Sequence, residues 1–325
     1  MSKKNKTSKT FISWIKKYLN KSIFLIFFLI FIAFYPGQNY YQTLKISFLP
    51  PKINPISDNF SFSPSFYPSV KGISSPPFIS ANAAILMDVP SAVILFQKNP
   101  YMVVSPASTT KIMTALVSLE HYKLDDVLLV RKLETVGATM GLSIGDRVTF
   151  ESVLYGLLVN SGNDAALVLA DNYPGGFDAF INKMNEKANE LALVRTHFVN
   201  PNGFTDQEHY TTALDLARLA SMAMKNPVFA KIVSTKNIIV TDIFKKKYYR
   251  LDNVNKLLGV VPGLTGVKTG WTTEAGECLV ASTERDDKKI ISVVLGSKDR
   301  FSETKELIEW GFGNFTWEEV PNNHL

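Results

Sequence analysis

Apolar residues recur with a helical period in the middle of the chain and form short continuous runs towards its C-terminal end. The helical spacing predicts helices over 108–122, 149–160, 164–172, 176–191, 212–225 and 301–312. Apolar runs flank Val89-Pro90-Ser91 and Asp286-Asp287, which predicts a β-hairpin at each place. Because strands lie on both sides of the helices, the sheet must join distant segments. We expect an α/β fold of the α+β sandwich kind, with an antiparallel sheet and flanking helices.

The first 41 residues follow a different pattern, a lysine-rich tail and then a purely apolar run. Residues 1–21 contain seven of the 35 Lys and Arg residues and no acid, which leaves 28 basic and 29 acidic residues downstream. The formal charge of +6 is therefore a property of the tail and does not indicate a nucleic-acid binding face. Residues 23–35 are apolar without interruption, and continuing to Tyr41 gives a span with aromatic residues at its end.

We interpret 23–41 as a transmembrane anchor or signal segment. An uncleaved anchor is favoured because no small-x-small cleavage site follows the run closely, and the A-x-A at Ala81–Ala83 lies far too late. Residues 1–22 are then a basic cytoplasmic tail, and the chain is a single-pass protein of the cell membrane with its folded domain on the extracytoplasmic side. Residues 42–78 are rich in proline and serine and are interpreted as a linker, 79–316 as the folded domain and 317–325 as a tail.

Several kinds of site find no support in the sequence. The single cysteine, Cys278, cannot form an intrachain disulfide and lies in an apolar context typical of packing. None of the four histidines has metal-ligand spacing, and no glycine-rich phosphate loop is present, so we predict no metal and no cofactor. GLSIG at 141–145 matches a nucleophile elbow, but its polar, turn-like flanks lack the strand and helix that this motif requires.

Serine and lysine at S-x-x-K spacing occur three times, as Ser13/Lys16, Ser108/Lys111 and Ser302/Lys305. Only the second pair opens a helix that is apolar on all sides and is therefore expected to be buried. Positions three apart share a helix face, so the hydroxyl and the amine can meet there. A buried lysine has a lowered pKa and can act as a base. On this helix alone, the favoured interpretation of Ser108 is a simple helix cap.

Two later segments change the interpretation. Ser161 and Asn163 form S-x-N between two apolar helices, where the alternative is an ordinary turn with Asp164 capping the next helix. Lys268, Thr269 and Gly270 form K-T-G beside the late hairpin, where the alternative is a turn at a strand end. The order S-x-x-K, S-x-N, K-T-G is typical of penicillin-binding proteins and class A β-lactamases.

Longer segments share this likeness: TTKIMTAL, LLVNSGNDAA, NPNGF, TALDLARLA and GVKTGWTTEAGECL. Residues 79–316 resemble the low-molecular-mass penicillin-binding D-alanyl-D-alanine carboxypeptidases of serine peptidase family S11, which implies a β-lactamase/transpeptidase-like fold. The resemblance implies that Ser108 is the nucleophile, Lys111 its base and Ser161 a proton relay. It assigns substrate binding to Asn163, Lys268, Thr269, Gly270 and Trp271. The amides of Ser108 and Trp271 would form the oxyanion hole.

The same resemblance implies the reaction: removal of the terminal D-alanine from peptidoglycan stem peptides through an acyl-serine, with β-lactams as inhibitors. Three alternatives stay open: a β-lactamase, a DD-endopeptidase and a non-catalytic wall-binding protein. Residues 193–204 contain no glutamate of the kind that class A β-lactamases use, which favours the peptidase. Many relatives carry a second domain and a C-terminal membrane helix, so we expect the anchor here to be N-terminal. Arg250 and Lys256 are candidates for a second cation that binds the substrate carboxylate.

Overall fold

The computed structural model describes residues 66–72 and 75–319. The basic tail, the expected span at 23–41 and most of the expected linker lie outside these residues. Among the helices that are described, none has the combination of length and apolar character that crossing a bilayer requires.

The described chain alternates between strands and helices. The strands are β1 (Phe66–Val70), β2 (Ala83–Asp88), β3 (Ile94–Lys98), β4 (Val127–Leu129), β5 (Arg147–Thr149), β6 (Asn237–Thr241), β7 (Tyr248–Asp252), β8 (Leu264–Thr272), β9 (Gly276–Arg285), β10 (Lys288–Ser297) and β11 (Phe315–Glu319). The helices are the 3₁₀ turn η1 (Ala107–Thr110), α3 (Lys111–His121), α4 (Phe150–Leu158), α5 (Asn163–Asn172), α6 (Gly176–Glu190), α7 (Ala213–Ala223), α8 (Pro227–Val233) and α9 (Arg300–Asn314).

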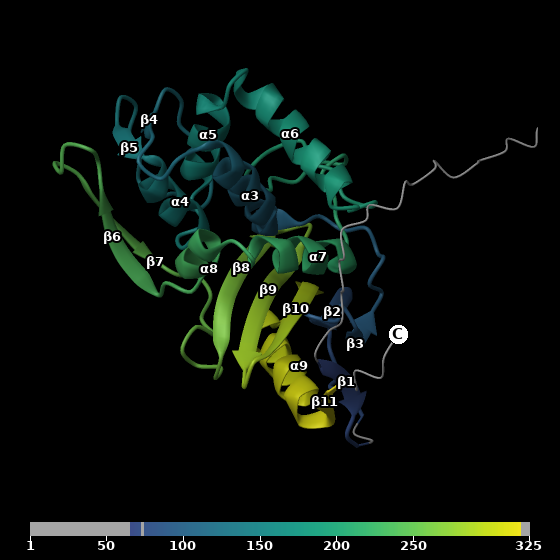
Figure 1. The fold of residues 1–325 in the computed structure, drawn as a ribbon. Coiled ribbons are helices and arrows are strands. Elements are labelled where there is room, and N and C mark those ends of the chain that lie inside the picture. The colour runs from purple at the N-terminus through teal and green to yellow at the C-terminus, as the bar shows by residue number, and fades with distance from the viewer. Residues whose placement is uncertain (1–65, 73–74, 320–325) are drawn as a thin grey trace, which may run out of the picture. The chain divides into compact units, whose positions relative to one another are not determined.

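The central sheet has the strand order β3-β2-β10-β9-β8, and each neighbouring pair is antiparallel. Both predicted hairpins are present, as β2–β3 and β9–β10. Distant segments meet between them, since Asp88 of β2 lies opposite Ile290 of β10. Figure 1 shows the helices α3–α8 gathered on one side of this sheet and α9 on the other. The prediction of an antiparallel sheet assembled from distant segments is confirmed.

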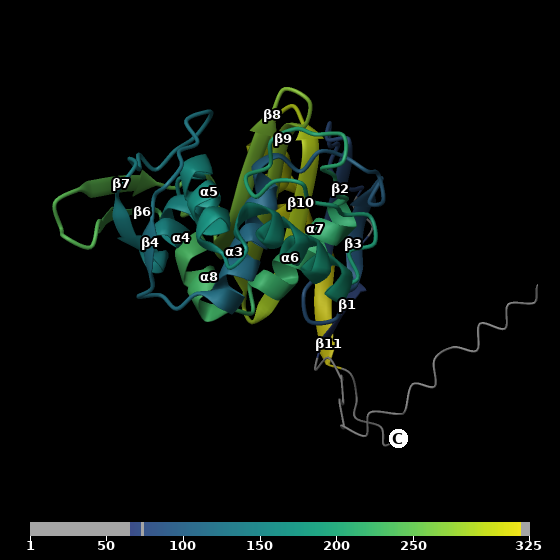
Figure 2. The same cartoon turned by 90° about the horizontal axis from the view of Figure 1, so that it is seen from above.

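Both faces of the sheet are buried, which explains why β9 and β10 read as continuous apolar runs. Side chains alternate between the two faces of a strand. In β10, Ile291 and Val293 join the core beneath the helical layer, whereas Ile290 and Val294 join a second core under α9. The layered arrangement is also visible from above (Figure 2).

Helix α3 is the centre of the helical layer and contacts α4, α5, α6 and α7. Every residue from Lys111 to Ser118 is buried, as the apolar surface of this segment predicted. Thr149 caps the next helix, because its hydroxyl accepts a hydrogen bond from the Ser152 amide at 3.2 Å. The first catalytic motif therefore opens a helix that the rest of the domain encloses.

The folded domain extends beyond the predicted limits of 79–316 at both ends. Strand β1 lies in the segment interpreted as linker, and β11 reaches into the expected tail. The two strands pair, with Phe66 opposite Glu319, and the Trp317 indole donates to Asp88 Oδ1 at 2.7 Å. The linker interpretation is therefore wrong for residues 66–70. A short strand needs a partner to be stable, and here the partner comes from the other end of the domain.

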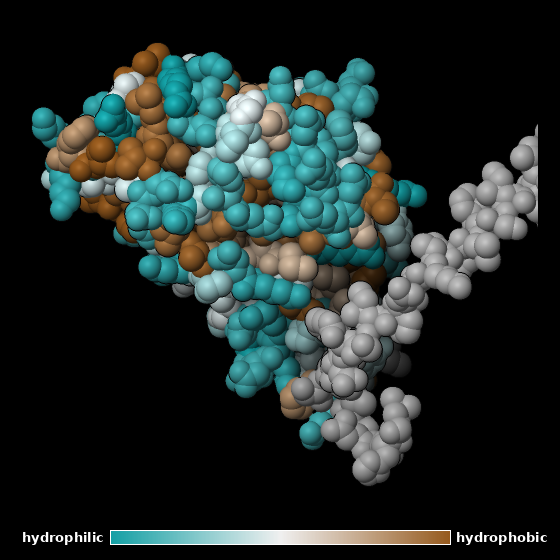
Figure 3. Space-filling model, turned by 45° about the horizontal axis from the view of Figure 1, so that its top comes forward, coloured by the Kyte–Doolittle hydropathy of each residue, from teal (hydrophilic) through white to brown (hydrophobic). Residues whose placement is uncertain are grey.

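The two-stranded sheets β4–β5 and β6–β7 were not predicted. Each strand of the first is only three residues long, too short for a period-2 pattern to be recognised. Apolar side chains gather on the surface at this end of the molecule (Figure 3), where Ile144 and Phe244 are exposed.

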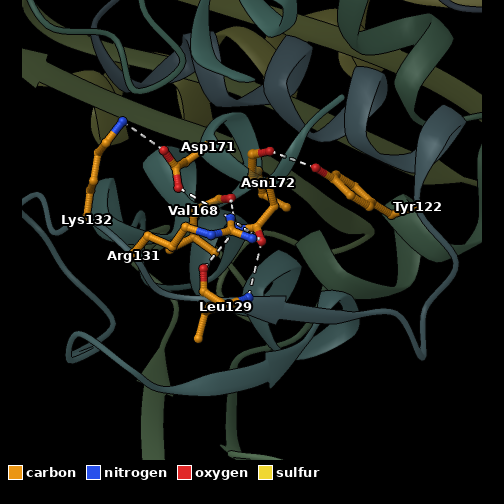
Figure 4. A network of polar contacts seen from close by, with 8 residues as sticks. Tyr122, Leu129, Arg131, Lys132, Val168, Asp171 and Asn172 are labelled. Atoms are coloured by element: carbon orange, nitrogen blue, oxygen red, sulfur yellow. Dashed lines mark hydrogen bonds and ion pairs between the residues drawn. The ribbon is translucent and has the colours of Figure 1, made fainter. Parts of the chain in front are cut away.

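A polar network fixes the place where the chain leaves β4 (Figure 4). The Asn172 amide accepts from the Leu129 N–H at 3.2 Å and donates to the Leu129 carbonyl at 3.0 Å. Arg131 donates to Asn172 Oδ1 at 3.0 Å, and Lys132 pairs with Asp171 at 2.9 Å. These contacts tie the start of the loop after β4 to α5, and the same loop goes on to line the candidate site.

Candidate active site

Ser108 lies in the 3₁₀ turn η1, and the α-helix begins three residues later than predicted, at the end of that turn. Ala107 has a φ of +47°, a left-handed value that is unfavourable for a residue with a side chain. Two hydroxyls hold this conformation: Thr109 donates to the Pro106 carbonyl at 2.6 Å, and Thr110 donates to the Ala107 carbonyl at 2.8 Å. The strained turn presents Ser108 at the edge of a cleft.

Lys111 is completely buried and points at Ser108. Its Nζ lies 2.9 Å from Ser108 Oγ and donates to Asn163 Oδ1 and to the Asn202 carbonyl, both at 2.7 Å. Burial, and then the nearby positive charge of Lys268, lower the Lys111 pKa well below its ordinary value. A neutral amine at this position can accept the hydroxyl proton, so the geometry suits a nucleophile and its base.

The other two S-x-x-K pairs do not provide a buried lysine beside a serine in the described residues. Ser302 and Lys305 are both exposed on α9, and the Ser302 hydroxyl donates to Glu306 at 3.1 Å. Ser13/Lys16 lies outside the described residues. GLSIG is followed by strand β5 and not by the helix that a nucleophile elbow requires, so this segment is not such an elbow.

The S-x-N motif lies in the turn between α4 and α5. Ser161 has a left-handed φ of +62°, while the Asn163 amide donates to the Val136 carbonyl at 2.7 Å and so contacts the loop after β4. Asp164 does not have the capping position that the alternative reading gave it, since the N-cap of α5 is Gly162. Its carboxylate instead accepts three amides of residues 140–142 at 2.9–3.1 Å. The turn is thus built to hold two polar side chains against Lys111 and Lys268.

The K-T-G motif lies within strand β8 at the edge of the sheet and not in a strand-end turn. Lys268 is buried and donates to Ser161 Oγ at 2.8 Å and to the Thr269 carbonyl at 3.0 Å. Burial, assisted by the charge of Arg300, lowers the Lys268 pKa to about 7. This lysine is therefore poised between its charged and neutral forms near physiological pH.

Gly270 lets β8 pass close to the nucleophile. A methyl group in place of its hydrogen would lie 3.1 Å from the Ser108 amide nitrogen and 3.1 Å from the Ala107 methyl group. The next residue, Trp271, has 61% of its surface exposed. The amides of Ser108 and Trp271 are therefore carried by segments in direct contact, as an oxyanion hole requires.

These segments surround one cleft of about 440 Å³, a size typical of small-ligand sites. Its lining includes six of the eight predicted site residues: Ser108, Ser161, Asn163, Thr269, Gly270 and Trp271. Lys111 and Lys268 are buried behind this lining. From the protein interior, Lys111 contacts Ser108 and Lys268 contacts Ser161.

The sequence reasoning missed Arg300. This residue begins α9, lines the cleft and donates from Nη1 to the Gly270 carbonyl at 2.7 Å. The two cations that were considered lie elsewhere: Arg250 pairs with Asp252 on an exposed strand, and the Lys256 amine lies over the Phe301 ring. No local motif marks Arg300, because its place beside K-T-G depends on α9 packing against β9 and β10.

Asn202 and Gly203 were also missed as site residues, although NPNGF was noted. The Asn202 carbonyl accepts from Lys111, and any side chain at Gly203 would overlap the Ala107 carbonyl, at 1.8 Å. Beside them, buried His209 contacts Thr110 Oγ1 at 2.8 Å. Its Nδ1 accepts the Val199 amide at 3.1 Å, so its Nε2 carries the proton and donates to the threonine. Burial lowers the His209 pKa to about 4, which keeps it neutral.

The described part of the chain offers neither a metal site nor a reactive cysteine. Residues 66–72 and 75–319 contain no group of three or more His, Cys, Asp or Glu residues that could hold a metal ion. Cys278 is buried, and burial raises its thiol pKa to about 11, as expected for a packing residue.

Comparison with known proteins gives a consistent result. The family model for D-alanyl-D-alanine carboxypeptidases, peptidase S11, matches residues 70–299. The chain is 34% identical over 245 residues to the D-alanyl-D-alanine carboxypeptidase DacF of Bacillus subtilis, covering 72% of this chain and 63% of DacF. It thus spans less than two thirds of that relative.

A D-alanyl-D-alanine endopeptidase of Pseudomonas aeruginosa is also 34% identical, over 71% of this chain and 77% of that protein. The solved structure of the Streptomyces K15 DD-transpeptidase superposes with a TM-score of 0.70 at 34% identity, covering 74% of this chain and 100% of the other.

Proposed function

Because this chain belongs to the D-alanyl-D-alanine carboxypeptidase family S11, we propose that it is a serine peptidase that removes the terminal D-alanine from peptidoglycan stem peptides. One observation carries the proposal: the fully buried Lys111 amine lies 2.9 Å from the Ser108 hydroxyl, at the edge of the cleft. A buried amine with a lowered pKa beside a serine is the arrangement that acyl transfer needs.

Acylation uses the first motif. Ser108 Oγ attacks the carbonyl carbon of the penultimate D-alanine while Lys111 Nζ takes the hydroxyl proton. The carbonyl oxygen becomes negative and is stabilised by the amides of Ser108 and Trp271. Collapse breaks the peptide C–N bond, and the proton passes through Ser161 to the leaving amine. Ser161 suits this role because its hydroxyl accepts from Lys268 at 2.8 Å and lines the cleft. Water then hydrolyses the ester.

The terminal carboxylate of the substrate is bound at the other lysine. Thr269 and Arg300 line the cleft, and Lys268 lies directly behind Thr269. The Arg300 Nε is buried and has no hydrogen-bond partner among the described residues, so the guanidinium has donor capacity left for an anion. Arg300 is accordingly our candidate for the second carboxylate-binding cation, in place of Arg250 or Lys256. Asn163, which also lines the cleft, holds the substrate amide.

A second candidate is a DD-endopeptidase, which is favoured by the similarity to the P. aeruginosa endopeptidase. The two activities share the acylation step and differ in the leaving group, so monomeric and crosslinked muropeptides separate them. Faster hydrolysis of the crosslinked substrate would assign the endopeptidase.

Intact-mass spectrometry after brief exposure to penicillin tests the peptidase proposal. A β-lactam's leaving nitrogen stays tethered in the ring-opened ester and obstructs water. We therefore expect one persistent adduct on the peptide that contains Ser108, and no adduct in Ser108→Ala. A return to the free mass within seconds, with penicillin hydrolysed in excess, would assign a β-lactamase. A chain that never forms the adduct is the wall-binding alternative.

We place the domain on the extracytoplasmic side of the cell membrane, held by residues 23–41. The lysine-rich tail before this apolar run supports that orientation. Protease added to intact spheroplasts should release the folded domain, and a fully protected domain would contradict this topology.

A further inference from the structure

The cleft is lined by two side chains of opposite charge. Among its lining residues only Arg300 and Glu274 have charged side chains. Arg300 lies beside Gly270, on the side where the proposed function places the substrate carboxylate. Glu274 lies in the turn after β8, beyond Trp271. A ligand that matches both side chains carries an anionic group and a cationic group.

The Glu274 carboxylate is held across the cleft. The Thr205 hydroxyl donates to Glu274 Oε2 at 3.0 Å and also lies 3.3 Å from the Thr272 hydroxyl. Thr272 Oγ1 in turn accepts the Ala275 amide at 3.0 Å, which fixes the shape of the turn. Hydrogen bonds from its own backbone amide and from Thr205 hold the Glu274 pKa below its usual range. A carboxylate has about four acceptor sites, so it keeps capacity for a cation.

The direction of the substrate follows from the proposed mechanism. Its carboxylate is bound at Thr269, and its scissile carbonyl lies at the Trp271 amide. The part of the peptide before the scissile bond therefore continues towards 272–274. Strand residues are spaced by about 3.3 Å, so Glu274 lies at most roughly 10 Å beyond Trp271 along the chain. That distance is within the reach of a long side chain on the residue before the two D-alanines.

We propose that Glu274, Thr205 and Thr272 form a cation subsite that recognises an ammonium group on the side chain of the residue preceding D-Ala-D-Ala. Trp271, whose side chain is exposed, lines the same cleft. This inference rests on the proposed peptidase function and adds to it a specificity-determining residue, Glu274, which discriminates a charged from a neutral side chain before D-Ala-D-Ala.

Matched substrates and variants of the full-length chain test the subsite. The substrates are Nα-acetyl-L-Lys-D-Ala-D-Ala, its Nε-acetylated form, and a neutral isostere that has L-2-aminoheptanoic acid in place of lysine. At low salt the wild type should favour the cationic substrate over both neutral ones by up to about five-fold in kcat/KM, the scale of an exposed ion pair. The preference should shrink as ionic strength rises.

Glu274→Gln should bring this ratio to about one, and Glu274→Lys should invert it. Glu306→Gln removes the same charge from the exposed surface of α9 and should leave the ratio unchanged. Thermal unfolding of Glu274→Gln and Glu306→Gln should match that of the wild type, which shows that the fold is intact. A preference that survives in Glu274→Gln, or its absence in wild type, would overturn the subsite. A wild type that neither hydrolyses these peptides nor binds penicillin would overturn the proposed function itself.

Discussion

Replacing Lys111 by alanine removes the amine that lies 2.9 Å from Ser108 Oγ and tests its role as the base. An ordinary lysine, with a pKa near 10.4, is neutral in only about one molecule in 2,500 at pH 7. Burial and the charge of Lys268 lower the Lys111 pKa well below that value and so enlarge the neutral fraction. Loss of a general base costs roughly 10²–10⁴ in rate, so we expect acylation to slow by at least ~100-fold.

The same change has a separate effect on stability that must be measured. Asn163 Oδ1 and the Asn202 carbonyl each lose a buried donor, at a cost of about 1–3 kcal/mol for an acceptor left unsatisfied. Removing a buried amine and placing alanine in a helix act in the opposite direction. We expect a melting temperature lower by several degrees, at about 2–4 °C per kcal/mol, with a cooperative transition retained.

The assay is the second-order rate constant for labelling by a fluorescent penicillin, measured below the melting temperature of each variant. Lys305→Ala is the matched control, because that lysine belongs to an S-x-x-K pair on the exposed surface of α9. The control should label at the wild-type rate. If Lys111→Ala also labels at a near-normal rate while folded, the assignment of Lys111 as the base is refuted.

Three further predictions follow from the charges around the cleft. Peptide kcat/KM should fall as pH rises through about 7, where Lys268 loses its charge, and a profile that stays flat from pH 6 to 9 would contradict that role. It should also fall at acid pH, where Lys111 takes up a proton. Arg300→Gln should lower kcat/KM for carboxylate substrates at least about ten-fold. Because the arginine lowers the Lys268 pKa, the fall of kcat/KM on the alkaline side should also move to higher pH in this variant, and an unmoved alkaline fall would exclude that coupling. His209 has a folded pKa of about 4 against an ordinary 6.5, so as pH falls the unfolded state binds this proton before the folded state does. Up to about 3 kcal/mol of the free energy of unfolding that is present above pH 6.5 should therefore be lost by pH 4. Urea unfolding of His209→Gln should show a smaller loss, and an equal loss would show that other groups cause it.

The sequence alone determined the features that depend on local pattern. The apolar surface of 111–119 required a buried helix, because no other environment covers apolar residues on every side. The alternation of apolar runs with turn residues located both hairpins of the central sheet. The order of the three motifs indicated the family, since each motif is a short segment whose chemistry is carried by neighbouring residues. All eight predicted site residues lie in or directly behind one cleft.

The tertiary structure decided what depends on contacts between distant segments. Strand β1 exists because β11 pairs with it. K-T-G lies in an edge strand because β8 pairs with β9 on one side and is the last strand of the central sheet. Arg300 reaches the cleft only because α9 packs under the sheet. Thr205 and Glu274 meet across the cleft from segments 69 positions apart. Such positions carry no periodic or motif signal of their own, because the partner that gives each its role is distant in the chain and adjacent only after folding.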